Sequence, residues 1–147
     1  MSSAAVRTAF EATLVVAYPD LPLVEIENVN VVPPKDANGR LTDFMAVLYM
    51  ATEDALGIGG KCFRERGTLN VLVYVQAGRG AAAAAGIADE LRNLFGGRDL
   101  PVAAPGMRLA ILDASPLTSY LGRPGVPVGA FYVGMIALTY EYDFLRS

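Results

Sequence analysis

The end of the chain carries the pattern that most limits how this sequence can fold. Residues 130–144 read AFYVGMIALTYEYDF, with apolar side chains on alternate positions and polar ones between them toward the end. The apolar even positions are Tyr132, Ile136, Leu138, Tyr140, Tyr142 and Phe144. A period of two is typical of a β-strand with one buried face. Residues 66–76 repeat it, and this second long strand has an aliphatic face of Leu69, Val71, Val73 and Val75.

Two helical patterns supply a layer that can cover such a sheet. In residues 3–17 the apolar stripe is Val6, Phe10, Leu14 and Ala17, at a period of 3.6. In residues 81–95 it is Ile87, Leu91, Leu94 and Phe95, and Gly96-Gly97 ends the helix. Further strands are expected at 24–28, 43–52 and 107–114.

The order of these elements predicts a single domain over residues 1–147. We expect an α+β fold: a two-layer sandwich with a mainly antiparallel, four- to five-stranded sheet and two helices on one face.

Three segments rich in proline or glycine interrupt the pattern, at 31–40, 54–62 and 118–129. In the first, Pro33-Pro34 and Asn38-Gly39 indicate an extended arm with a turn at its tip. Loops of about a dozen residues are uncommon in compact domains unless they function. We therefore expect these segments to project from the domain and to make contacts.

Composition narrows the function classes. The chain has no histidine, which removes the commonest general base and metal ligand, and its one cysteine, Cys62, excludes an internal disulfide. The net charge is −3 and no basic cluster is present, which argues against direct binding of nucleic acid. The hydrophobic fraction of 53% suggests apolar surface that partner subunits cover. Neither a signal-peptide core nor a membrane-length apolar run occurs, so we expect a product made in the cytoplasm.

The turn Gly78-Arg79-Gly80 is a candidate phosphate-binding loop. It opens the second helix, and with Ala83 it satisfies G-x-G-x-x-A, while Asp113 at the end of a later strand could bind a ribose. A dinucleotide domain, however, needs a parallel sheet with several crossover helices, whereas no helix pattern follows this one. We favour a structural turn, with a small nucleotide-binding enzyme as the remote alternative.

Other candidate sites also favour structural interpretations. Cys62 lies near Lys61, Arg64 and Arg66, but without histidine an activated thiol lacks a partner base. The acidic residues Glu25, Glu27, Glu141 and Asp143 alternate with apolar residues, as on a solvated sheet face. We therefore expect no enzyme activity, no catalytic or metal-binding residue and no cofactor.

The order of three segments resembles the phage tail terminator-like family of long-tailed phages. These segments are EIENVNVVPP, FRERGTLNVLVYVQAGRGAAAAAGIADELRNLF and LTYEYDF. In the family, an Asn and a Pro-containing arm precede an Arg-Gly pair that opens a strand, and a Gly-rich turn then begins a helix ending in Phe. The matching positions here are Asn28, Pro33-Pro34, Arg66-Gly67, Gly78-Arg79-Gly80 and Phe95.

The resemblance implies a structural virion protein, made in the bacterial host and located in the virion tail. Such a protein assembles as a homo-oligomeric ring, a hexamer in the family, which caps the tail tube, ends tail polymerisation and provides the head-joining surface. Its implied partners are the tail tube protein, the head connector or stopper protein and the tape-measure protein. DNA passes through the lumen without specific binding, which the acidic net charge favours. The alternative within structural proteins is another neck factor, such as a stopper.

On this hypothesis, the first two projections carry the contacts with neighbouring subunits and the tube. The predicted contact residues are Val32, Pro33, Pro34, Lys35, Asn38, Arg40, Leu56, Ile58, Lys61 and Arg64. Tyr120 and Arg123 are predicted to face the head.

Overall fold

The described part of the chain forms two helices and seven strands. The computed structural model describes residues 4–25, 34–56, 62–76, 80–102, 106–115, 118–119 and 131–145. The elements are α1 (Ala4–Ala17), β1 (Leu23–Glu25), β2 (Phe44–Leu56), β3 (Cys62–Gln76), α2 (Gly80–Phe95), β4 (Asp99–Leu100), β5 (Gly106–Ala114), β6 (Thr118–Ser119) and β7 (Phe131–Leu145).

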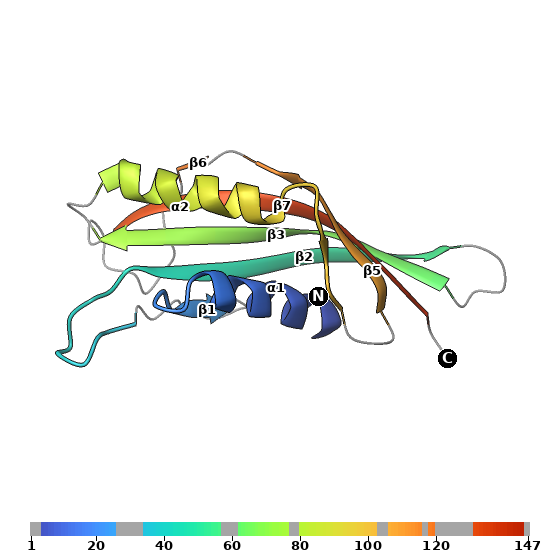
Figure 1. The fold of residues 1–147 in the computed structure, drawn as a ribbon, viewed down its shortest axis with the longest axis horizontal. Coiled ribbons are helices and arrows are strands. Elements are labelled where there is room, and N and C mark those ends of the chain that lie inside the picture. Colours follow the sequence, from blue (N-terminus) through green and yellow to red (C-terminus); the bar gives the residue numbers. More distant parts are fainter. Residues whose placement is uncertain are drawn as a thin grey trace.

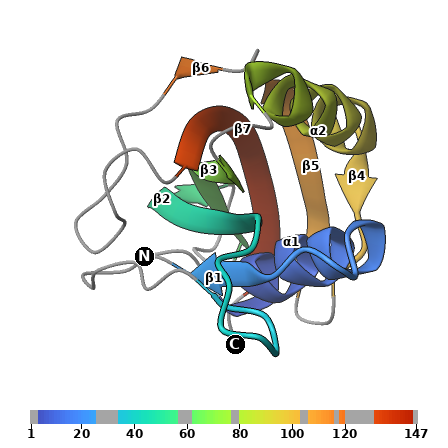
Figure 2. The same cartoon turned by 90° about the vertical axis from the view of Figure 1, so that its left-hand side faces the viewer.

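The strands form one sheet in the order β1-β2-β3-β7-β5-β4, with β6 paired to β7. Every neighbouring pair is antiparallel except β1 and β2, which are parallel. Four long strands, β2, β3, β7 and β5, form its body, and both helices pack on the same face (Figures 1 and 2). The predicted α+β class, with two helices on one face of a mainly antiparallel sheet, is confirmed.

The core lies between this face of the sheet and the helices, as the two alternating strands predict. Its buried side chains include Val6, Phe10 and Leu14 from α1, Ala84, Ala88, Leu91 and Phe95 from α2, and Leu69, Val71, Val73, Val75, Ile136, Leu138, Tyr140 and Tyr142 from the sheet. Phe10 lies at its centre, with its ring centroid 5.7 Å from that of Phe95 and 5.5 Å from that of Tyr140. Both helices are therefore held to the sheet through one aromatic cluster.

The opposite face of the sheet changes character along its length. At one end the rings of Phe44 and Tyr74 stack with centroids 4.3 Å apart, and Phe131 packs edge-on against both. At the other end, Arg64 of β3 pairs with Asp143 of β7. This face is thus apolar near the start of β2 and ionic near its end.

The prediction of a loop over residues 54–62 is wrong in its bounds, because both neighbouring strands extend into this range. Residues 54–56 belong to β2, and β3 begins at Cys62 rather than at Arg66, so every residue of β2 pairs with β3. Two contacts with β7 support this extension: the ion pair of Arg64 with Asp143, and the stacking of Phe63 on Phe144 at 5.9 Å. Figure 1 shows the strands running past the ends of both helices.

Candidate contact surfaces

The first predicted projection is an ordered arm, of which residues 34–43 are described. Its turn is closed by the Asp36 carboxylate, which accepts hydrogen bonds from the backbone N–H groups of Asn38 and Arg40, each at 2.9 Å. Gly39 adopts a φ of 76°, a left-handed conformation that favours glycine, so the turn expected at Asn38-Gly39 is confirmed. A single β-bridge, Lys35 to Leu41, joins the two sides of the arm.

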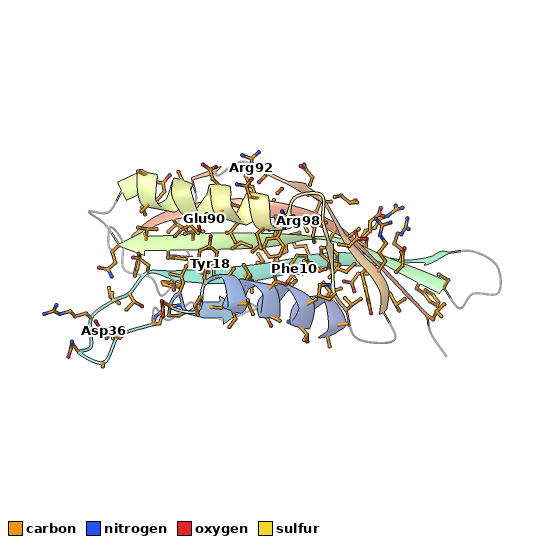
Figure 3. All side chains as sticks on the ribbon, viewed as in Figure 1. Phe10, Tyr18, Asp36, Glu90, Arg92 and Arg98 are labelled. Carbon is orange, nitrogen blue, oxygen red and sulfur yellow. The ribbon has the colours of Figure 1, made fainter. Side chains whose placement is uncertain are left out.

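The base of the arm is bound to the end of β3. The side-chain amide of Gln76 donates to the carbonyl oxygen of Leu41 at 2.5 Å, and the backbone N–H of Gln76 donates to the carboxylate of Asp43 at 2.9 Å. Beyond this base, residues 35–40 are all exposed, and Figure 3 shows Asp36 at the far end of a projection that leaves the body of the domain. The arm therefore exposes Lys35, Asn38 and Arg40 to solvent.

Arg64, a predicted contact residue, is held within its own sheet. Its guanidinium donates two hydrogen bonds to the Asp143 carboxylate, at 2.7 Å and 3.0 Å, and Nη1 lies 3.4 Å from Glu141. Arg66 also pairs with Glu141, at 3.4 Å. Hydrogen bonding from Arg64 lowers the pKa of Asp143, so the ion pair is present at neutral pH and is lost as the pH falls through that lowered pKa. Glu141 and Asp143 are thus ion-paired rather than simply solvated.

Several predicted residues have no described placement. Val32, Pro33, Ile58, Lys61, Tyr120, Arg123 and Glu27 lie outside the described residues, as do Gly78 and Arg79. Leu56 ends β2, and Pro34 begins the described arm. Two sets of predicted roles stay predictions. They are the subunit and tube contacts of Val32, Pro33, Pro34, Lys35, Asn38, Arg40, Leu56, Ile58, Lys61 and Arg64, and the head-facing role of Tyr120 and Arg123.

An apolar groove of about 780 Å³ lies beside α1. It is lined by small and aliphatic side chains, among them Ala5, Ala9, Ala12 and Val16 of α1 and Leu94 of α2. Val16 is 82% exposed, and Met50 on β2 is 61% exposed. These apolar groups are exposed in the single chain, and their cover by partner subunits stays a prediction.

The structure does not bring together the residues of the candidate nucleotide site, Gly80 and Asp113. Gly80 begins α2, whereas Asp113 lines a polar pocket with Gly96 and Gly97, which follow the other end of that helix. A helix of 16 residues is about 24 Å long, so Gly80 and Asp113 are too far apart to bind one ribose-phosphate unit. The described residues contain no group of three potential metal ligands, and no described helix is long and apolar enough to cross a membrane.

Sequence reasoning missed a buried polar cluster on the core face. Glu65 is only 4% exposed and accepts a hydrogen bond of 2.8 Å from the Tyr140 hydroxyl. Gly67, two residues along β3, leaves the space that the Tyr140 ring occupies. The sequence held one signal for this cluster. Residues 65 and 67 are odd-numbered, so on a strand they share the face of the aliphatic residues that begin at Leu69.

Comparison with solved structures supports the fold. One solved chain superposes with a TM-score of 0.63 at 24% sequence identity, and the match covers 100% of this chain and 99% of the other. At that identity the likeness shows the arrangement of helices and strands alone. No curated protein was found to match.

Comparison with protein families extends over most of the chain. The family described as phage tail terminator protein matches residues 3–117, which include α1, the arm, the β2–β3 hairpin and α2. The order of motifs noted in the sequence lies largely within this match. This chain belongs to the phage tail terminator family and has a structural role in a phage tail.

Proposed function

We propose that this protein forms a homo-oligomeric ring that caps the tail tube, ends tube polymerisation and offers the surface to which the head is joined. The observation that carries the proposal is the braced arm at residues 34–43. Its turn is fixed by Asp36, yet residues 35–40 are exposed. An arm ordered in advance loses little further conformational entropy when it binds, which favours a role in contact.

The proposed partners follow from the position of such a ring. One side meets the tail tube protein and, inside the tube, the tape-measure protein; the other side meets the head connector or stopper. A hexamer matches the symmetry that the family resemblance implies. The net charge of −3 per chain favours a lumen through which DNA passes without specific binding.

A stopper-like neck protein is the alternative. It shares the need for exposed contact surfaces but binds the head connector rather than the tube. Cross-linking of the purified protein to connector particles, but not to tubes, would favour that alternative.

Binding to isolated tail tubes tests the proposal. Gold-labelled protein is expected at one end of each tube in negative-stain micrographs, because a cap binds only the growing end. Label spread evenly along the tube wall would refute the proposal. The double variant Lys35→Glu/Arg40→Glu is expected to lose end binding, whereas the control Arg92→Glu/Arg98→Glu, which makes the same charge change at exposed residues outside the arm, is expected to retain it.

A further inference from the structure

Several charged side chains of the sheet already have a partner within the chain. The guanidinium of Arg64 lies 2.7 Å from the carboxylate of Asp143, and that of Arg108 lies 3.0 Å from the carboxylate of Asp99. Each of these pairs brings opposite charges together without a second molecule. Charged groups that lack such a partner are the ones that another molecule can bind.

The tip of the arm, residues 35–40, carries two cations of this second kind. Lys35 and Arg40 are exposed, and no ion pair or hydrogen bond engages either charged group within the part of the chain that the structure describes. The carboxylate of Asp36 lies between them in sequence, but it accepts two backbone hydrogen bonds that close the turn. The tip is therefore net positive, and its shape is fixed in advance.

A polar pocket of about 480 Å³ lies where the end of α2 meets β5. It is lined by Asp89 and Asn93 of α2, by Leu112 and Asp113 of β5, and by residues that include Gly97. Gly97 adopts a φ of 66° just after the helix ends. The last carbonyl groups of a helix carry partial negative charge, so this end of α2 favours a cation.

The two carboxylates of the polar pocket also lack a cationic partner. No described residue forms an ion pair or hydrogen bond with the side chain of Asp89, and the carboxylate of Asp113 accepts a hydrogen bond from the N–H of Ala114 at 2.9 Å. Arg92 lines the same pocket and offsets one of these charges. Two carboxylates and a helix C-terminus against one guanidinium leave the pocket net negative.

The arm and the polar pocket lie on opposite sides of the molecule. Figure 3 shows Asp36 at the far end of the arm and Arg92 on the outer side of α2. The end view in Figure 2 agrees, because the arm lies on the side of α1 and the pocket on the side of α2. The arm therefore cannot reach the pocket of its own chain, and a contact between them joins two copies.

We propose that the tip of the arm binds in the polar pocket of a second copy. The two arm cations, Lys35 and Arg40, then face the two pocket carboxylates, Asp89 and Asp113. The tip enters as a closed turn, so its internal hydrogen bonds are kept and little conformational entropy is lost. This contact rests on the proposed ring and specifies how its neighbours are joined, because a head-to-tail contact repeats until the rotation closes.

The salt dependence of self-association tests the nature of the contact. Exposed ion pairs are weak one by one and are screened by salt, so the wild-type protein is expected to associate at low ionic strength and to dissociate as salt is added. Light scattering gives the mass against the monomer value of 15.6 kDa. A wild-type chain that stays monomeric at low salt and high concentration would overturn the proposal, and so would association that salt does not weaken.

Charge reversal on each side tests which surfaces meet. Lys35→Glu/Arg40→Glu and Asp89→Lys/Asp113→Lys are each expected to be monomeric, because like charges then face each other. A mixture of the two variants is expected to associate again, since the arm of each meets a pocket of opposite charge on the other. Circular dichroism checks that both variants are folded. If the folded variants do not associate when mixed, the arm does not bind this pocket.

Two single changes give the controls. Asp20→Lys makes the same charge change as Asp89→Lys at an exposed acid outside the pocket, so Asp20→Lys is expected to keep the wild-type mass and Asp89→Lys to lower it. Arg92→Gln removes the cation from the pocket and is expected to raise the salt concentration at which the oligomer dissociates. Equal masses for the two lysine variants, or a weaker Arg92→Gln oligomer, would contradict the proposal. The proposed cap fails separately, if the wild-type protein does not bind tube ends.

Discussion

Phe10→Ala is expected to lower the free energy of unfolding by about 3–5 kcal/mol, the usual cost of removing a large buried aromatic side chain. Phe10 is fully buried, and its ring packs against those of Tyr49, Phe95 and Tyr140. These partners come from β2, α2 and β7, so one substitution opens a cavity where both helices meet the sheet. Chemical denaturation followed by circular dichroism measures the change.

Val16→Ala is the control for this prediction. It lies on the same helix, but its side chain is 82% exposed, so the change is expected to stay within about 0.5 kcal/mol. Similar losses for the two variants would contradict the assignment of Phe10 to the centre of the core.

Gly67→Ala is expected to destabilise the protein by about 2–5 kcal/mol, through overpacking and the disturbance of a buried hydrogen bond. A Cβ at this position would lie 2.7 Å from the Tyr140 hydroxyl oxygen and in hard contact with the backbone oxygen of Met50. Either β2 must move or Tyr140 must turn away from Glu65, to which it donates at 2.8 Å. The midpoint of urea unfolding is the readout.

Gly86→Ala makes the same chemical change with the opposite expected sign. Gly86 lies within α2, and a Cβ there meets nothing within 4 Å. Replacing a helical glycine with alanine stabilises by about 0.5–1 kcal/mol. If both alanine variants shift stability in the same direction, steric conflict at Gly67 is not the cause.

The long strands and both helices could be predicted because their patterns are local. The alternation of Leu69, Val71 and Val73 and the helical spacing of Val6, Phe10 and Leu14 each identify a buried face, and these residues are all buried. The start of β3 could not be predicted in this way. By sequence, Arg64 and Arg66 are typical of a loop. In the fold they pair with Asp143 and Glu141 on β7, and Arg64 and Asp143 are 79 positions apart, so no local pattern indicates the pairing.

The candidate surfaces were predictable to a similar degree. Asn38-Gly39 identified the turn at the tip of the arm, because such a turn needs a residue that tolerates a positive φ. The bracing by Asp36 and the anchoring by Gln76 depend on distances that the sequence does not give. The described pairing of β1 with β2 ends at Val47, and no local pattern marks that limit either.

Tail length in particles that lack this protein tests the central claim most directly. If the protein caps the tube, negative-stain micrographs of particles made without it should show headless tails of irregular and excessive length. Adding the wild-type protein during assembly should restore a uniform length. Headless tails of normal length would contradict the cap and assign the protein to the neck, and intact particles would contradict both roles.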